Sequence, residues 1–249
     1  MFLQACETFG LVGRATSLRP SGGYEPFGGG HEVVEIWSNE HKKWVYVDGN
    51  TTYYAVDAQT SVPLSLLELH DRQLQALAGQ PDSEPVRIVQ LGKTPFEWKG
   101  LTTWPPFVGL RMIPRSNFLE KESPVPTHQG MGAGCQWTGH YIWSDALAPA
   151  VRLYGNRVTK RANWEWTLNQ AHYVLEATGT PGELRVHLDT ETPGFQTFLA
   201  DIDGKGKSPV PPVFTWTLHD GRNRLEVQPR NKAQRDGIAS WVVVDYQGR

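Results

Sequence analysis

Cysteine is scarce in this chain, which has only Cys6 and Cys135 among its 249 residues. Two cysteines do not make a disulfide framework, and no CxxC spacing indicates a zinc site. No apolar run approaches the roughly 18–20 residues that a membrane span needs, and no lysine- or arginine-rich block indicates a nucleic-acid surface. We therefore expect no metal, no cofactor, no nucleic-acid partner and no membrane span.

The rest of the composition is typical of a folded protein. Hydrophobic residues make up 39% and charged residues 20%, with a formal net charge of -2, so the chain can bury a core. The first ten residues, MFLQACETFG, lack the basic start and the long apolar stretch of a secretory signal. Location and oligomeric state are left open, although an extracytoplasmic location would follow if a signal sequence was lost with the N-terminus.

The first 80 residues carry the clearest secondary-structure signals. Apolar residues recur at helical spacing up to Phe9, and Gly10 fits a helix stop. Alternating runs then predict strands, two of them joined as a hairpin by a short turn, over 11–18, 31–37 and 43–47. A helix is predicted over 65–78, where leucines line one side and Gly79 marks the stop.

Beyond residue 80 the pattern changes twice. Prolines interrupt residues 81–150, which we predict as irregular connecting structure with short strands over 86–91 and 140–144. Short alternating runs with glycine turns then recur, as is typical of an immunoglobulin-like β-sandwich, over 164–168, 171–177, 183–188, 197–202, 213–218, 224–228 and 240–246. Three parts are therefore expected: 1–80, 81–150 and 151–249.

Seven residues in the first part form a pattern that resembles the transglutaminase-like superfamily. The pattern reads GxxxR, then H-x-x-x-E-x-W, then W-x-x-x-D, and falls on Gly10, Arg14, His31, Glu35, Trp37, Trp44 and Asp48. The resemblance covers roughly a third of the chain and implies a papain-type cysteine hydrolase domain, here without its N-terminal part. With it, the expected fold class is α+β: a partial transglutaminase-like domain followed by an all-β immunoglobulin-like sandwich.

The resemblance implies catalytic roles for His31 and Asp48. A cysteine hydrolase needs an imidazole beside the sulfur and a carboxylate that fixes the tautomer of that imidazole. Because a hairpin brings the ends of its two strands together, we expect His31 and Asp48 to lie within hydrogen-bonding distance. The expected activity is that of a peptidase or amidase.

The nucleophile of such a site is missing from the pattern. In the family the cysteine opens the helix that here ends at Gly10, and that position would precede Met1. Cys6 lies near the helix end, where no helix N-terminus lowers the pKa of a thiol. Cys135, in GAGCQWTG, follows the histidine and the aspartate, which reverses the order of the family. We therefore expect no thiol sulfur beside the imidazole.

Two other functions remain open at this point. A carbohydrate-active hydrolase would use a pair of carboxylates. Glu35 shares the strand face of His31 and is then the catalytic candidate beside Asp48. The alternative for Glu35 is a structural role as a buried, paired side chain. A non-catalytic binding protein on the same fold is the other possibility. Trp37 and Trp44 are the candidates for substrate binding, with a peptide or a carbohydrate as the ligand.

Overall fold

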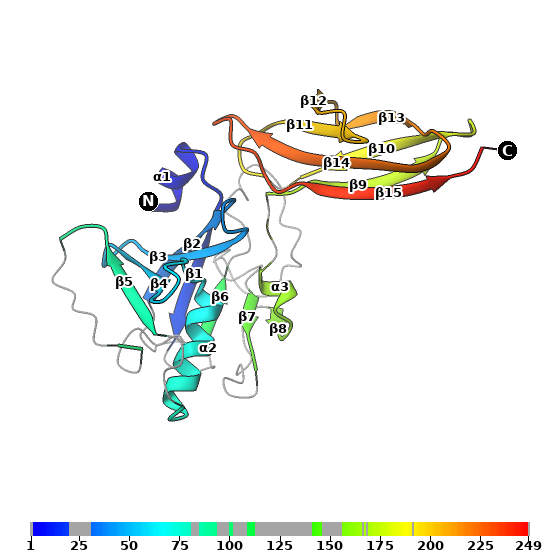
Figure 1. Cartoon of the computed structure of the whole chain (residues 1–249). Coiled ribbons are helices and arrows are strands. Elements are labelled where there is room, and N and C mark those ends of the chain that lie inside the picture. The colour runs from blue at the N-terminus through cyan, green and yellow to red at the C-terminus, as the bar shows by residue number, and fades with distance from the viewer. Residues whose placement is uncertain are drawn as a thin grey trace, which may run out of the picture. The chain divides into compact units, whose positions relative to one another are not determined.

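Figure 1 shows the computed structural model, which describes residues 2–19, 31–80, 85–93, 100–101, 109–112, 141–145, 156–165, 167, 169–190 and 192–248. The chain divides into two compact units. The first unit comprises Met1–Ala5 and Gly13–Thr167, and the second comprises Cys6–Val12 and Leu168–Arg249.

The expected α+β fold class is wrong, because the described part of the chain is mostly β. Strands and isolated bridges take up 52% of these residues and helices only 13%. The helices are α1 (Phe2–Thr8), α2 (Leu66–Leu77) and the short α3 (Ala162–Glu165). The balance shifts toward β partly because two segments outside the predicted strands, β6 (Gly109–Met112) and β8 (Asn156–Val158), also join one sheet.

One eight-stranded sheet builds the first unit. Its order is β5-β4-β3-β2-β1-β6-β7-β8, and every neighbouring pair is antiparallel except β7 and β8. The strands are β1 (Gly13–Arg19), β2 (His31–Ser38), β3 (Lys43–Asp48), β4 (Tyr53–Asp57), β5 (Val86–Gln90), β6 (Gly109–Met112), β7 (Tyr141–Trp143) and β8 (Asn156–Val158). The predicted hairpin is therefore present as β2 and β3, which lie near the middle of the sheet.

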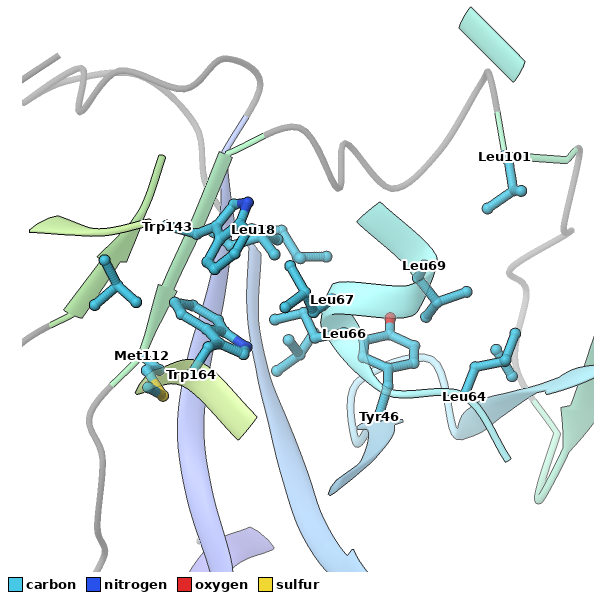
Figure 2. Packing of buried hydrophobic residues seen from close by; sticks show 14 of the residues in the cluster. Leu18, Tyr46, Leu64, Leu66, Leu67, Leu69, Leu101, Met112, Trp143 and Trp164 are labelled. Carbon is cyan, nitrogen blue, oxygen red and sulfur yellow. The ribbon is translucent and has the colours of Figure 1, made fainter. Parts of the chain in front are cut away.

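Helix α2 supplies much of the core of this unit. Its start is fixed by a capping box, in which the Ser65 hydroxyl accepts from the backbone N–H of Glu68 and the Glu68 carboxylate accepts from that of Ser65. Figure 2 shows the buried cluster to which the helix contributes Leu66, Leu67 and Leu69. The sheet and α3 contribute aromatic and aliphatic side chains to the same cluster, among them Leu18, Tyr46, Met112, Trp143 and Trp164.

The second unit contains two sheets around a separate core. A three-stranded sheet has the order β13-β10-β9 and a four-stranded sheet the order β12-β11-β14-β15. The strands are β9 (His172–Ala177), β10 (Glu183–Asp189), β11 (Phe195–Ile202), β12 (Lys207–Val210), β13 (Val213–Thr217), β14 (Gly221–Asn231) and β15 (Ser240–Tyr246). Side chains of both sheets share one apolar cluster, which is compatible with a β-sandwich.

The strand predicted over 164–168 is wrong, because Trp164 lies in helix α3. Four residues are too few to show a helical period, and Trp164 and Glu165 begin what reads as an alternating run. From residue 169 onward the described residues form strands and turns without a helix. None of the described helices is long and apolar enough to cross a membrane.

Candidate functional site

His31 and Asp48 meet at one end of the β2–β3 hairpin. His31 is the first residue of β2 and Asp48 the last residue of β3. The register pairs Val34 with Val47, so the two side chains are diagonal neighbours on one face. The Nε2 atom of His31 lies 2.6 Å from Oδ2 of Asp48. The contact expected from the sequence is confirmed, whereas the catalytic role of each residue stays a prediction.

Asp48 is held in its ionised form by several donors. Its side chain is 0% exposed, and its Oδ1 atom accepts hydrogen bonds from the backbone N–H groups of Asn50 and Thr51 at 2.9 and 3.2 Å. Burial by itself raises the pKa of Asp48, but the hydrogen bonds from His31 and Thr51 outweigh this, so that the pKa lies below its ordinary value. The turn after β3 thus fixes the carboxylate before it meets the imidazole.

The ionised Asp48 determines which ring nitrogen of His31 carries the proton. A carboxylate can only accept, so Nε2 donates the hydrogen bond, and in the neutral ring Nδ1 is then the basic nitrogen. The His31 side chain is 15% exposed, so the ring is partly accessible. An imidazole of this kind can take up a proton at Nδ1 while Asp48 stabilises the resulting cation.

Glu35 lies on the same face of β2 but makes different contacts. Its Oε2 atom accepts from Nε and Nη2 of Arg14 at 2.9 and 2.6 Å, and its Oε1 atom accepts from the backbone N–H of Leu66 at 2.8 Å. Arg14 also donates from Nη1 to the backbone carbonyl of Trp164 at 2.5 Å. Both carboxylate oxygens of Glu35 are therefore engaged in joining β1, β2 and the start of α2. These contacts favour the structural role over the catalytic one.

The two tryptophans proposed for substrate binding are buried. Trp37 and Trp44 pack edge to face with their ring centroids 5.3 Å apart. The guanidinium of Arg14 lies 4.2 Å from the centre of the Trp44 ring, a cation–π distance. In this structure both rings contact the protein interior, and their geometry gives no support to stacking against a substrate.

Of the two cysteines, only Cys6 lies in the described part of the chain. It is buried near the end of α1, and burial, followed by the charge of Glu7, raises the pKa of its thiol. A raised pKa disfavours the thiolate, which is the nucleophilic form. Cys135 lies outside the described residues, so its candidacy is not addressed by the structure.

A second histidine–aspartate pair went unnoticed in the sequence. His70 of α2 is fully buried, and its Nε2 atom lies 2.8 Å from Oδ2 of Asp145, which also accepts from Nε1 of Trp143 at 2.9 Å. The two residues of the pair are 75 positions apart in the sequence. Because only the packing of α2 against the end of β7 brings them together, no local pattern could have indicated them.

Within the part of the chain that the structure describes, no group of three or more histidine, cysteine, aspartate or glutamate side chains is arranged to hold a metal ion. Of the two histidine–aspartate pairs described above, the His31 side chain is partly accessible, whereas the His70 side chain is fully buried. Comparison of the whole chain with models of known protein families and with curated proteins finds no match.

Proposed function

We propose that His31 and Asp48 form the base-and-orienting pair of a transglutaminase-like cysteine hydrolase site that acts on an amide or peptide bond. The observation that supports this most directly is the 2.6 Å contact through Nε2 to a fully buried carboxylate. The order of the motif residues along the chain, from Gly10 and Arg14 to Trp44 and Asp48, supports it from the sequence.

The pair accounts for the two proton transfers of the acylation step, which leaves the acyl group on the sulfur as a thioester, and for the later step in which Nδ1 takes a proton from the water that hydrolyses this thioester and returns it to the sulfur. With a thiol as the nucleophile, Nδ1 of His31 takes the S–H proton as the sulfur attacks the carbonyl carbon. The same proton then passes from Nδ1 to the leaving nitrogen as the C–N bond breaks. Asp48 stays ionised throughout and stabilises the imidazolium.

Cys6 does not fit the role of the thiol. It is buried, its pKa is raised, and it lies late in α1 rather than at a helix N-terminus. Cys135 follows the histidine and the aspartate in the sequence, which reverses the order of the family. We therefore propose that this chain supplies the histidine and the aspartate without the thiolate, and that by itself it has no thiol-dependent peptidase, amidase or acyl-transfer activity.

The second unit is proposed to be an immunoglobulin-like domain. Sheets of four and three strands are the division found in the constant-type immunoglobulin sandwich, and the second unit has this division. Such a domain contributes no residue to the His31–Asp48 pair, whose contacts lie within the first unit.

Nitrogen-15 NMR of the histidine rings tests the pair. We expect a protected, hydrogen-bonded Nε2–H proton on His31, and loss of its resonance through exchange with solvent in Asp48→Ala. Asp57→Ala is the matched control, because Asp57 also accepts from the backbone N–H groups two and three residues later, those of Gln59 and Thr60. A His31 Nε2–H resonance that Asp48→Ala leaves unchanged would overturn the proposal.

A second experiment tests whether the chain lacks a reactive thiolate. The protein is alkylated briefly with iodoacetamide and analysed by mass spectrometry, and its activity is measured in parallel on a panel of amide, peptide and glycoside substrates. We expect slow labelling of Cys6 and no activity that alkylation removes. Rapid, selective labelling of Cys6 or Cys135 with parallel loss of a hydrolytic activity would show that the chain does contain its nucleophile.

A further inference from the structure

The outer face of the four-stranded sheet in the second unit carries an unusual set of side chains. On β14, Leu225 and Val227 point into the core, so Arg224 and Glu226 alternate onto the outer face, as does Gln228, which is itself buried there. On β15, Val242 and Val244 pack against the core, so Trp241, Val243 and Asp245 lie outward. We call this surface the β15 face.

One row of side chains crosses all four strands of the β15 face. The registers pair Lys207 with Asp201, Asp201 with Glu226, and Glu226 with Trp241. Three strand spacings of about 4.8 Å make this row about 14 Å long. The row therefore presents hydrogen-bonding groups on three strands and an aromatic ring at its end on β15.

Trp241 differs from the other tryptophans in the described residues. It is 61% exposed, whereas the remaining five are buried, namely Trp37, Trp44, Trp143, Trp164 and Trp216. Exposed tryptophan is rare on a surface without a partner and is enriched where ligands bind. Its ring is also oriented, because the guanidinium of Arg224 lies 5.6 Å from the ring centre.

The polar groups of the row and of its neighbours on β14 are held in place by one another. Nη2 of Arg224 donates to Oε2 of Glu226 at 2.7 Å, and Nζ of Lys207 donates to Oε1 of Gln228 at 2.6 Å. Nζ of Lys207 also lies 4.0 Å from Oε1 of Glu226. The row therefore offers one donor, the ammonium of Lys207, and two acceptors, the carboxylates of Asp201 and Glu226, and a hydroxyl group can bond to either kind.

The charge of the β15 face argues for a neutral ligand. Four basic side chains, Lys207, Arg222, Arg224 and Arg230, are balanced by four acidic ones, namely Asp201, Glu226 and Asp245 on the strands and Asp236, which pairs with Arg230. A balanced surface gives no electrostatic attraction to nucleic acid or to anionic lipid, both of which need an excess of positive charge. Neutral sugars combine apolar C–H faces with hydroxyl groups and match an aromatic ring flanked by such polar groups.

We propose that the β15 face binds a neutral polysaccharide, with a sugar ring stacked on Trp241 and its hydroxyl groups hydrogen-bonded along the row toward Lys207. This binding is independent of the His31–Asp48 pair, which lies in the first unit. It gives the second unit a function of its own, that of holding the chain on a glycan.

The test is affinity gel electrophoresis of the whole chain in gels that contain hydroxyethyl cellulose, xyloglucan, mixed-linkage glucan or glycol chitin, followed by calorimetry with oligosaccharides of the retarding polymer. We expect retardation by at least one of these polymers. Trp241→Ala should weaken that binding about tenfold or more, while Trp241→Phe, which keeps an aromatic face, should retain most of it.

Val213→Ala is the matched control, because Val213 is an exposed apolar residue on the other sheet; it should bind like the wild type. Because Trp241 is exposed, its replacement should leave the circular dichroism spectrum unchanged. Three results would overturn the proposal: no retardation by any polymer, retardation that Trp241→Ala leaves intact, or concentration-dependent self-association that Trp241→Ala removes, which would assign the β15 face to a second copy of the chain.

Discussion

Replacing Glu35 by glutamine should destabilise the first unit far more than the same replacement at Glu32, three residues earlier on the same strand. Glu35 is 0% exposed and accepts two hydrogen bonds from Arg14 and one from the backbone of Leu66. Glu32 lies on the opposite face, is 65% exposed and pairs with Arg111 at 3.2 Å. The pair of variants therefore compares one substitution at a buried and at an exposed site.

The magnitude follows from what remains after each substitution. In Glu35→Gln the single oxygen can accept either from the backbone of Leu66 or from Arg14, and the amide NH2 then faces the other donor. In either orientation the buried guanidinium has lost its counter-charge. Breaking one side of a buried ion pair costs roughly 3–5 kcal/mol, and by the same principle we expect about 3 kcal/mol for Glu35→Gln. An exposed pair contributes about 0–1 kcal/mol, so Glu32→Gln should cost less than about 1 kcal/mol.

Hydrogen exchange measured by mass spectrometry at increasing urea concentration reads the stability of β2 directly, without interference from unfolding of the second unit. A double variant, Arg14→Met with Glu35→Leu, should cost less than the sum of its two single variants, because it removes both buried charges together. If Glu35→Gln costs no more than Glu32→Gln, Glu35 does not have the structural role assigned to it, and the question of its catalytic role reopens.

Two further predictions concern other parts of the molecule. The pKa of Asp48 is lower in the folded than in the unfolded chain, so the contribution of Asp48 to stability is present above the unfolded pKa and is lost as pH falls through the folded pKa. The difference in unfolding free energy between wild type and Asp48→Asn should therefore be larger near neutral pH than in acid. Urea titrations that show the opposite trend would contradict this assignment. In the second unit, a Cβ on Gly237 would lie 2.4 Å from the backbone oxygen of Asn169, whereas one on Gly92 in the first unit meets Thr52 only at 3.4 Å. Thermal unfolding should show a loss of about 2 kcal/mol for Gly237→Ala and little change for Gly92→Ala, and equal melting temperatures would refute the close approach.

The helices and strands that have a clear local signal could be predicted from the sequence alone. The hairpin of β2 and β3 could be predicted because strand periods flank a short turn, and the meeting of His31 with Asp48 follows once these strands are adjacent. Helix α2 could be predicted because four leucines share one side and a stop residue follows. The strands of the second unit were recognisable for the same reason, since each alternates over five or more residues, apart from the four-residue β12.

Other features depend on contacts between distant parts of the chain, which no local periodicity in the sequence indicates. Strands β6 and β8 have four and three residues, which is too short for an alternating pattern, and they become strands because β1 and β7 give their backbone groups partners. The motif named Arg14 and Glu35 without indicating that they pair, because their contact depends on the register of β1 against β2. His70 and Asp145 meet only through packing between elements far apart in the sequence. The expected α+β fold class was wrong for the same reason. Short segments joined the sheet through backbone pairing with strands distant in the sequence, and local propensity does not indicate such pairing.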